Sequence, residues 1–316
     1  MIEAVALSKH YGPKTAVDDL SFVVRPGVVT GFLGPNGSGK STTMRLLLGL
    51  DRPNAGTSSI NGKPYVEHPA PLREVGALLE ARAVHTGRSA RNHLRAMAAT
   101  NNIPRTRVDE MIGLVGLEGV ADKRVGGFSL GMGQRLGIAS ALLGDPGVLL
   151  LDEPVNGLDP EGILWIRNLL KALAAEGRTV FVSSHLMSEM AVTAGELIVV
   201  GRGKLITSGS VADVIRGAGS GAVLVRTGEA DRLASLLAGT AQHIHRLAPD
   251  TLQVSGTDST TIGLIAAREA IPLVELTPQQ ATLEEAFMEI TRDAVEFHGG
   301  APSGDESQPA PAGGLR

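Results

Sequence analysis

The sequence contains no cysteine, which excludes disulfide bridges, zinc–thiolate sites and catalysis by a thiol nucleophile. It also lacks an excess of either charge: 29 basic and 33 acidic side chains leave a formal net charge of −4, so nothing argues for a nucleic-acid partner. No apolar run approaches the ~20 residues that cross a bilayer, and residues 1–12 lack the basic start and apolar core of a secretion signal. We therefore expect a chain that is soluble by itself and that needs a partner for any role at a membrane.

Glycine, in contrast, is abundant, with 40 residues. Residues 31–50, GFLGPNGSGKSTTMRLLLGL, contain the pattern G-x-x-x-x-G-K-[ST], in which backbone N–H groups wrap phosphates. The apolar run before the pattern predicts a buried strand, and the leucine-rich run after it predicts a helix. Because a helix N-terminus attracts anions, this context favours a phosphate-binding loop over a chance match, whose prior is about a few per cent.

The chemistry of such a loop assigns roles to its residues, although the pattern by itself does not distinguish ATP from GTP. Glycines let the backbone approach the ligand without an intervening Cβ. Lys40 would reach the β- and γ-phosphates, and the hydroxyl of Ser41 would ligate Mg²⁺. The residues that we predict to contact the nucleotide in this loop are Gly34, Pro35, Asn36, Gly37, Ser38, Gly39, Lys40, Ser41 and Thr42.

Strand-like and helical patterns alternate over most of the first 215 residues. Residues 1–30 alternate short apolar runs with turns and predict a small antiparallel unit. Residues 80–121 and 130–143 have helical patterns, whereas 147–154 and 178–185 read as strands on either side of another helix. This alternation predicts an α/β fold with a parallel sheet and helices on both of its faces.

The C-terminal third has a different organisation, which begins after a glycine-rich linker at 217–221. The order βαββαβ predicts a small α+β domain of the ferredoxin-like type, followed by a final helix. The predicted elements are strand 222–227, helix 229–238, strands 242–247 and 251–255, helix 258–269, strand 272–276 and helix 282–292. We therefore divide the chain into domains 1–216 and 217–294 and a tail, 295–316, whose Pro/Gly/Ser-rich composition predicts disorder.

Two acidic residues, Asp152 and Glu153, end the apolar run GVLLLDEP. In open α/β sheets ligands bind at the carboxyl ends of the strands, where Asp152 could help to hold Mg²⁺ and Glu153 could orient or deprotonate an attacking water. Taken alone, such a pair is more often a solvated loop. Its combination with the phosphate loop makes the Mg²⁺ interpretation the favoured one.

The segment FSLGMGQR, residues 128–135, precedes the acidic pair. Ser129 is a good N-cap for the helix that follows, and Gly131 leaves the backbone open near that terminus. Spacing alone leaves two readings at about even odds: an ordinary capped helix, or a second anion-binding helix end that serves another phosphate.

The order of these motifs resembles the nucleotide-binding subunit of an ABC transporter, over roughly residues 1–215. The resemblance rests on the phosphate loop, a Q-loop position in VGALLE, a signature in FSLGMGQR, a Walker B motif in LLLDEP, a D-loop in NGLDP and a switch histidine in VSSHL. It implies a P-loop NTPase (ABC ATPase) core with an antiparallel β-subdomain and a helical subdomain that carries the signature.

The resemblance also implies roles for single residues. Tyr11 would stack on adenine, His185 would contact the γ-phosphate, and Asp159 would communicate across a dimer. Ser129 and Gly131 would contact the γ-phosphate of ATP bound to the opposite subunit. The implied catalytic residues are Lys40, Glu153 and His185, and the implied Mg²⁺ ligands are Ser41, Asp152 and Glu80, the last at the Q-loop position.

Two departures from the family pattern stand out: Leu130 and Met132 interrupt the common signature LSGGQ, and Glu80 replaces glutamine. Together with LEEAFMEIT at 283–291, they resemble the ATP-binding subunits of bacterial drug and peptide-antibiotic exporters. This resemblance implies ATP and Mg²⁺, a homodimer, an integral membrane permease as partner and a place at the cytoplasmic face of the membrane. The alternative is a soluble ATPase of the same type with a non-membrane target; the tandem cassettes or long coiled coils usual there are missing.

His243 and His245 alternate on one predicted strand face, in QHIHR, and could suggest a metal. Without a nearby cysteine or a clear third ligand, we favour a surface strand.

Overall fold

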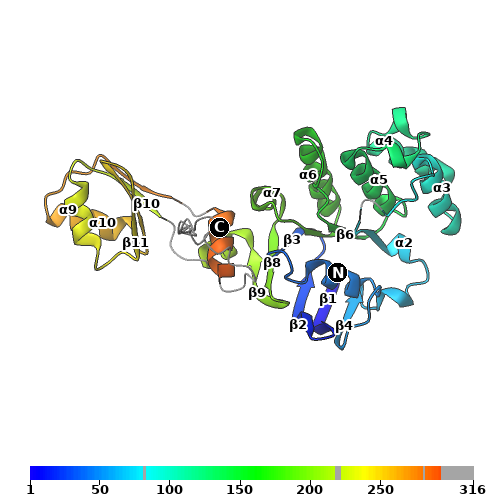
Figure 1. Cartoon of the computed structure of the whole chain (residues 1–316), viewed down its shortest axis with the longest axis horizontal. Coiled ribbons are helices and arrows are strands. Elements are labelled where there is room, and N and C mark those ends of the chain that lie inside the picture. Colours follow the sequence, from blue (N-terminus) through cyan, green and yellow to red (C-terminus); the bar gives the residue numbers. More distant parts are fainter. Residues whose placement is uncertain (81–82, 218–221, 280–281, 293–316) are drawn as a thin grey trace, which may run out of the picture.

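The structure is a computed structural model that describes residues 1–80, 83–217, 222–279 and 282–292 (Figure 1). The described residues form three sheets, of three, six and four strands. The first is antiparallel, with the order β2-β1-β4, and it confirms the small antiparallel unit expected near the N-terminus. Its strands are β1 (Ile2–Tyr11), β2 (Lys14–Val24) and β4 (Ala55–Ile60).

The six-stranded sheet has the order β5-β6-β7-β3-β8-β9. Its neighbours pair in parallel except β8 and β9, which form an antiparallel edge, so the expected parallel sheet is confirmed. The strands are β3 (Val29–Leu33), β5 (Val75–Leu78), β6 (Val148–Asp152), β7 (Thr179–Ser183), β8 (Glu196–Gly201) and β9 (Lys204–Ser210).

Both faces of this sheet are covered. Successive side chains of a strand point to opposite faces, so each strand contributes residues to two cores. Leu149 and Leu151 of β6 belong to the core beneath the helices, whereas Val148 and Leu150 belong to the core shared with the antiparallel sheet. Phe181 lies in the second core, with its ring centroid 5.7 Å from that of Phe22. This layering fixes the carboxyl edge of β3, β6 and β7, where the loop 34–39, the pair Asp152 and Glu153, and His185 lie.

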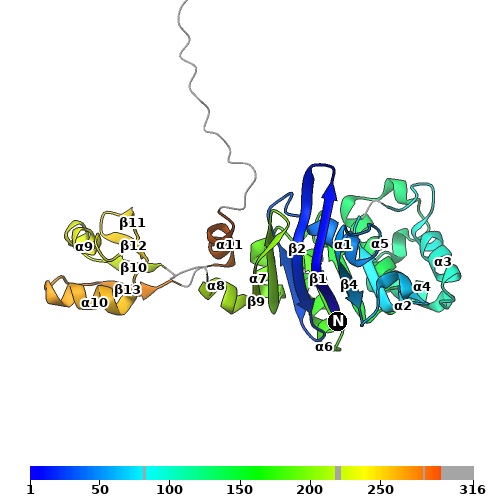
Figure 2. The ribbon, with the colours of Figure 1, turned by 90° about the horizontal axis from the view of Figure 1, so that it is seen from below.

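Most helices lie on the face of the six-stranded sheet opposite the antiparallel strands, α1 packs into the core that the two sheets share, and the helical subdomain lies at one end (Figures 1 and 2). In the expected helical stretch 80–121, residues 83–89 are not helical, α3 begins only after its N-cap Ser89, and α4 follows. The helices are α1 (Lys40–Leu47), α2 (Pro71–Glu74), α3 (Ala90–Thr100), α4 (Arg105–Leu114), α5 (Leu130–Leu142), α6 (Pro160–Ala175), α7 (Met187–Thr193) and α8 (Val211–Gly217). In the described parts of the chain, no helix has the length and apolar character that a bilayer span requires.

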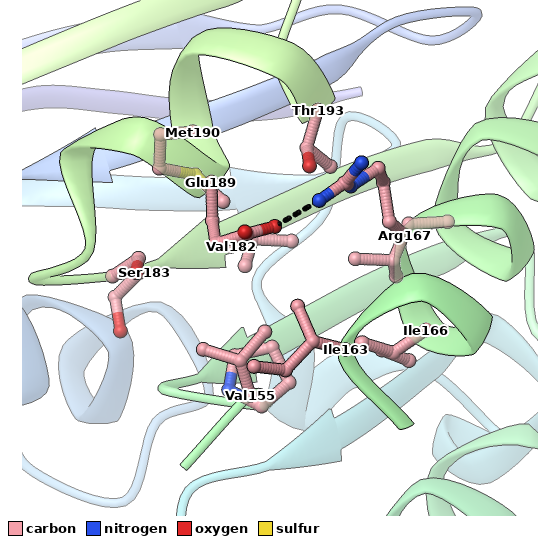
Figure 3. A pocket seen from close by; sticks show the side chains of 12 residues that line it. Val155, Ile163, Ile166, Arg167, Val182, Ser183, Glu189, Met190 and Thr193 are labelled. Atoms are coloured by element: carbon pink, nitrogen blue, oxygen red, sulfur yellow. Dashed lines mark hydrogen bonds and ion pairs between the residues drawn. The ribbon is translucent and has the colours of Figure 1, made fainter. Parts of the chain in front are cut away.

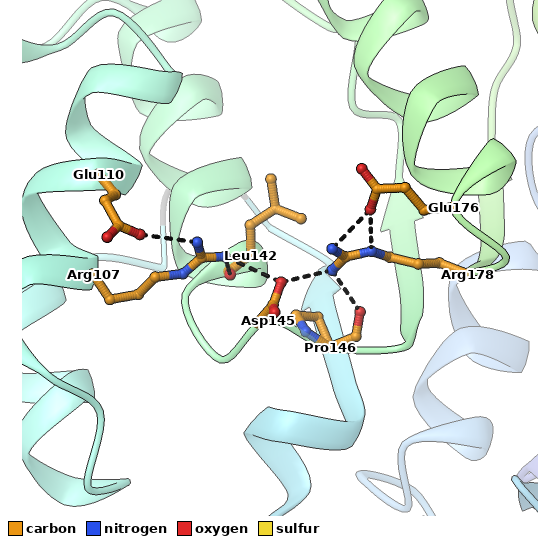
Figure 4. A network of polar contacts seen from close by, with 7 residues as sticks. All are labelled: Arg107, Glu110, Leu142, Asp145, Pro146, Glu176 and Arg178. Carbon is orange, nitrogen blue, oxygen red and sulfur yellow. Dashed lines mark hydrogen bonds and ion pairs between the residues drawn. The ribbon is translucent and has the colours of Figure 1, made fainter.

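A polar network fastens the helical subdomain to the core (Figure 4). Asp145, after α5, accepts hydrogen bonds from Arg107 of α4 at 3.3 Å and from Arg178, before β7, at 2.9 Å. Arg107 also bonds the carbonyl of Leu142 at the end of α5, at 3.2 Å. Helices α4 and α5 are therefore tied to each other and to the start of a central strand.

A four-stranded antiparallel unit follows, with the order β11-β12-β10-β13. The sequence β10-α9-β11-β12-α10-β13 confirms the predicted βαββαβ order and the ferredoxin-like topology. The last strand begins at Glu275, three residues later than predicted, and ends at Pro278. The elements are β10 (Val223–Arg226), α9 (Ala230–Leu237), β11 (His243–Ala248), β12 (Thr251–Ser255), α10 (Ser259–Arg268) and β13 (Glu275–Pro278).

The final helix, α11 (Leu283–Thr291), packs on α7 and α8 rather than on the four-stranded unit (Figure 2). Leu283 and Phe287 belong to the core beneath the helices of the six-stranded sheet. The predicted domain 217–294 had grouped this helix with the unit. The difference arises because α9 and α10 pack on the unit's own sheet, whereas the apolar face of α11 packs against the domain 1–216, which we call the cassette. The expected linker, beyond Gly217, and the tail 295–316 lie outside the described residues.

Candidate nucleotide site

The loop 34–39 connects β3 to α1, as the motif predicts. Gly39 has φ of 99°, and a Cβ built there would lie 2.3 Å from the carbonyl oxygen of Ala16. A Cβ at Gly34 would lie 2.5 Å from the carbonyl oxygen of Val200. Both glycines are therefore required by the packing of the loop against the antiparallel sheet and β8, even before a ligand is considered.

Lys40 lies inside this loop and is 8% exposed. Its Nζ donates to the carbonyl oxygens of Gly34 at 2.6 Å and Pro35 at 3.2 Å. Burial lowers the pKa of Lys40, and the carboxylates of Glu153 and Asp152 act in the opposite direction. An ammonium group so enclosed needs anionic partners, which phosphates would supply.

Ser38 is a second residue of the loop whose polar group a ligand would satisfy. Within the described residues, its buried Oγ has no hydrogen-bond partner. Leaving a buried hydroxyl unpaired costs about 1–3 kcal/mol, so a polar ligand in the loop would relieve it. The loop thus fits a phosphate group by backbone shape, by charge and by hydrogen-bonding capacity.

Asp152 is held from two sides. The Ser41 hydroxyl at the start of α1 donates to its Oδ2 at 2.7 Å, and the Ser183 hydroxyl donates to its Oδ1. Ser183 is fully buried at the end of β7, where the register pairs it with Asp152. Sequence reasoning missed Ser183; the available signal was a serine that ends an otherwise apolar strand, VFVS.

Glu153 and His185 form a second pair at the same edge. His185 Nδ1 lies 2.8 Å from Oε2 of Glu153, and the backbone N–H of His185 points to the same oxygen at 3.4 Å. Glu153 has φ of 51°, in the left-handed region that a glutamate rarely adopts. Its backbone N–H donates to Ser183 Oγ at 2.9 Å. The structure therefore brings the predicted acid and the predicted switch histidine into direct contact.

The oxygen atoms at this edge suit Mg²⁺, which prefers oxygen ligands and usually keeps several waters besides one or two carboxylates. Ser41 and Asp152 supply adjacent hydroxyl and carboxylate oxygens and fit that requirement. Glu80 is exposed two residues after β5, and because Leu78 pairs with Leu151, it lies at the same edge as Asp152. Among the residues described, no group of three or more His, Cys, Asp or Glu side chains gathers for a metal, which an ion held largely by phosphates and water does not need.

The signature segment has the predicted N-cap: Ser129 Oγ accepts from the N–H of Met132 at 3.2 Å. Its backbone lies against the D-loop of the same chain, since a Cβ at Gly131 would be 2.8 Å from the carbonyl oxygen of Gly157. Leu130, in place of the family's glycine, covers Gly157 and is 46% exposed. The N-cap is therefore confirmed, whereas the choice between an ordinary capped helix and a helix end that also binds a phosphate stays open.

Asp159 caps α6, with its Oδ1 accepting from the N–H of Gly162 at 2.9 Å. Tyr11 is 47% exposed at the end of β1 and donates to Asp51 at 2.9 Å, while Arg45 of α1 bonds the same carboxylate. Desolvation and the nearby Asp51 raise the pKa of Tyr11. Its ring thus lies near the C-terminal end of α1, whereas the phosphate loop leads into the N-terminus of the same helix.

Two further features lie outside the nucleotide edge. His243 and His245 are exposed on β11, as expected for a surface strand.

A cavity with room for about one water lies between α6, α7 and β7 (Figure 3), and the ion pair Arg167–Glu189, at 2.6 Å, crosses it. This cavity is too small for a nucleotide and belongs to the packing of the two helices.

Gln134 is a site residue that sequence reasoning also missed. It is 3% exposed in α5, and its Nε2 donates to the carbonyl oxygen of Glu153 at 3.0 Å. The signal in the sequence was a polar side chain on the buried side of an otherwise apolar helix.

Comparisons with known proteins agree with this geometry. The family described as "ABC transporter" matches residues 17–156, and a "Domain of unknown function (DUF8746)" matches residues 221–284. The chain is 42% identical over 216 residues to the uncharacterized ABC transporter ATP-binding protein YhcH of Bacillus subtilis, covering 67% of this chain and 71% of YhcH. It is 42% identical over 209 residues to the bacitracin transport ATP-binding protein BcrA of Bacillus licheniformis, covering 65% and 68%.

A longer match includes the C-terminal unit. The Nod factor export ATP-binding protein I of Ralstonia nicotianae is 33% identical over 304 residues, which cover 92% of this chain and 94% of that protein. Among solved structures, an ATP-binding subunit of an ABC transporter superposes with a TM-score of 0.64 at 26% identity, over 69% of this chain and 92% of that one. The chain therefore belongs to the ATP-binding proteins of ABC transporters, and it binds and hydrolyses ATP.

Proposed function

We propose that two copies of this protein enclose two ATP molecules, hydrolyse them and thereby power a separate integral membrane permease that exports a drug or peptide antibiotic. The observation that carries this proposal is the convergence of Lys40, the Ser41–Asp152 pair and the Glu153–His185 pair at one edge of the sheet. This set contains a phosphate-binding cation, a metal-binding pair and a water-activating acid.

The residues divide the work of hydrolysis between them. Lys40 would exchange its loop carbonyls for the β- and γ-phosphates. Ser41 and Asp152, with Glu80 at the same edge, would hold Mg²⁺, which neutralises charge on the phosphates when bound. Glu153 would orient the attacking water and accept its proton, and His185, which now contacts Glu153, would donate to the γ-phosphate.

The second subunit would complete each site. Ser129 and Leu130 are exposed at the N-terminus of α5, so the signature surface is open to a partner's nucleotide. We infer that Ser129 Oγ and the backbone N–H of Gly131 meet the γ-phosphate bound by the other copy, and that Asp159 lies at the same interface. Tyr11 would stack on the adenine of its own subunit.

The names of the relatives support a transport role and an export direction. BcrA is named for bacitracin transport and the Ralstonia relative for Nod factor export, while two streptococcal relatives, 34% identical, are named for lantibiotic transport. We infer that this chain acts as a peripheral subunit at the cytoplasmic face of the membrane. A soluble ATPase with a non-membrane target is not favoured by any of these names.

The test is reconstitution with a permease. The chain, carrying an affinity tag, is purified from detergent-solubilised membranes of its host, and a co-purifying multispan protein is identified by mass spectrometry. The pair is then placed in liposomes with the ATP-binding subunits outside. ATP-dependent accumulation of a cyclic peptide antibiotic inside, lost with Glu153→Gln, is expected. A chain that hydrolyses ATP but neither retains a multispan protein nor drives uptake would refute the export proposal.

A further inference from the structure

The backbone of Glu153 is held in an unusual conformation by its neighbours. Its φ of 51° is one that non-glycine residues adopt at a cost, and such residues persist where the surroundings over-determine them. The N–H of Glu153 donates to Ser183 Oγ at 2.9 Å. Its carbonyl oxygen accepts from Gln134 Nε2 at 3.0 Å and from the N–H of Asn156 at 3.2 Å. Both ends of this residue are therefore fixed by side chains from other elements.

These two side chains come from different parts of the fold. Ser183 ends β7 in the rigid centre of the sheet, whereas Gln134 belongs to α5 of the helical subdomain. Gln134 is 3% exposed, so its amide is largely shielded from water. The direction in which Glu153 points its carboxylate, toward His185, thus depends on where α5 lies relative to β6.

Helix α5 begins with the signature. Its N-cap is Ser129, and Gln134 follows five residues later, about 7–8 Å further along the axis. The next residue, Arg135, lies with its guanidinium 5.0 Å from the ring of Trp165 in α6 and donates to the carbonyl of Val115. A displacement of the signature end of α5 would therefore displace Gln134 as well, because a helix of this length moves as a unit.

We propose that Gln134 is a positioning residue: it sets the orientation of Glu153 and links it to the signature helix of the same chain. When Ser129 engages the nucleotide of the partner subunit, α5 is fixed, and Gln134 then fixes the acid that serves the chain's own nucleotide. The two ATP sites of a dimer are thereby connected through one side-chain amide. This inference rests on the proposed function, in which Glu153 activates water and Ser129 acts across the dimer.

The test removes the donor and keeps the volume. Gln134→Met retains a side chain of similar length and cannot donate to Glu153. The matched control is Leu136→Met, a change two residues away in the same helix at a position that is fully buried. For Gln134→Met we expect kcat to fall roughly 10- to 100-fold, as for a small misplacement of a reacting group. We expect KM and nucleotide affinity to stay within about twofold, and Leu136→Met to leave all three values near the parent's.

A double-mutant cycle with Glu153→Gln separates positioning from general damage. If Gln134 acts through the Glu153 carboxylate, Gln134→Met should cost almost nothing further in a Glu153→Gln background. Multiplicative losses in the double variant, or equal losses in kcat and nucleotide affinity, would assign Gln134 a purely structural role and overturn the proposal. Unchanged kcat in Gln134→Met would do the same.

The same cycle distinguishes failure of this inference from failure of the proposed function. Near-parental hydrolysis in the single variant Glu153→Gln would remove the acid from its proposed role, whatever Gln134 does. If Gln134→Met does not fold, Gln134→Glu keeps the size and replaces the donor amide with a carboxylate. The same 10- to 100-fold loss of kcat at unchanged affinity is expected of it, and a parental kcat would overturn the proposal.

Discussion

The nucleotide edge of the cassette and the four-stranded unit differ in how their polar side chains are held. At the edge, Ser41 and Asp152 bond each other although 111 residues separate them in the chain, and Ser183 joins them from a third element. In the described residues of the unit, no charged or histidine side chain is buried: His243 and His245 are exposed, and ion pairs such as Arg232–Glu229 connect neighbouring turns of one helix. Exposed pairs of this kind contribute about 0–1 kcal/mol. The buried polar side chains among these residues of the unit are threonines, and Thr227 donates to the backbone carbonyl of Pro272 at 2.8 Å.

This contrast distinguishes the nucleotide edge, a candidate functional site, from the four-stranded unit, a structural scaffold. Bringing the buried Ser183 and the half-buried Asp152 together from distant segments is costly, so the cassette edge is expected to be a functional site. Solvated polar side chains carry no such cost, so the unit's alternating pattern indicates its fold and nothing about its reaction. The comparisons divide in the same place, since residues 17–156 match the ABC transporter family and residues 221–284 match a domain of unknown function.

The largest effect is expected at the edge itself, from Glu153→Gln. This change keeps the size of the side chain and removes the proton acceptor, so turnover should fall roughly 10²- to 10⁴-fold while ATP binding persists. ATP-bound dimers should accumulate, which size-exclusion chromatography would detect. The control is Glu161→Gln, an exposed acid in the first turn of α6, which should hydrolyse ATP like the parent. Normal turnover in Glu153→Gln would mean that Glu153 is not the proton acceptor for the attacking water.

The second effect tests whether the edge is complete in one chain. Ser129→Arg places a bulky side chain where the partner's γ-phosphate would sit, so each subunit should bind ATP while the homodimer loses most of its activity. Combining Ser129→Arg subunits with Lys40→Ala subunits puts both changes into one composite site and leaves the other intact. Partial activity of this mixture, with neither homodimer active, is the expected outcome of an ATPase assay. An active Ser129→Arg homodimer would show that the signature does not act in trans.

The sequence predicted the parts of the edge that form local motifs. Lys40, Ser41 and Asp152 were placed because a loop pattern and the rule that ligands bind at the carboxyl ends of strands both concern neighbouring residues. Ser183 was missed because its role depends on the register between β6 and β7, and Gln134 was missed because its role depends on how α5 packs on the end of β6. Neither relation is written in a short segment of sequence.

For the fold, too, the sequence predicted local elements but not how distant elements pack. The βαββαβ order of the unit was predicted from alternating patterns, and the structure confirms it. The partner of α11 was not predicted, because an amphipathic helix shows that one face is buried without showing what buries it. Its place on α7 and α8 also makes the boundary between the two regions discontinuous: the chain leaves the cassette after α8 and returns to it with α11.

A smaller effect, on thermal stability, should test whether α11 belongs to the cassette. Phe287 is 8% exposed in the cassette core, whereas its neighbour Met288 is 65% exposed. Phe287→Ala should destabilise the cassette by about 3 kcal/mol, and Met288→Ala by about 0.5 kcal/mol or less. Thermal unfolding followed at Trp165, the single tryptophan of the chain, reports on the cassette alone. Equal midpoints for the two variants would mean that α11 does not belong to the cassette core in solution.

The smallest effect is expected from removing the four-stranded unit and keeping α11. Residues 218–281 would be replaced by a short Gly/Ser linker, which suffices because α8 and α11 pack against each other. The residues of the nucleotide edge all precede the excised segment, so ATP affinity and turnover of the isolated protein should stay within about twofold of the parent. The matched comparison is truncation after residue 217, which removes the unit and α11 together and exposes the apolar surface that Leu283 and Phe287 cover. That truncation should lower the unfolding midpoint, whereas the replacement should not.

The excised segment, expressed alone as residues 218–281, should unfold cooperatively, with mixed α/β circular dichroism, because it has its own apolar core. A replacement variant that loses turnover while its unfolding midpoint is unchanged would mean that the unit acts on the nucleotide edge, and the separation of site from scaffold would then fail.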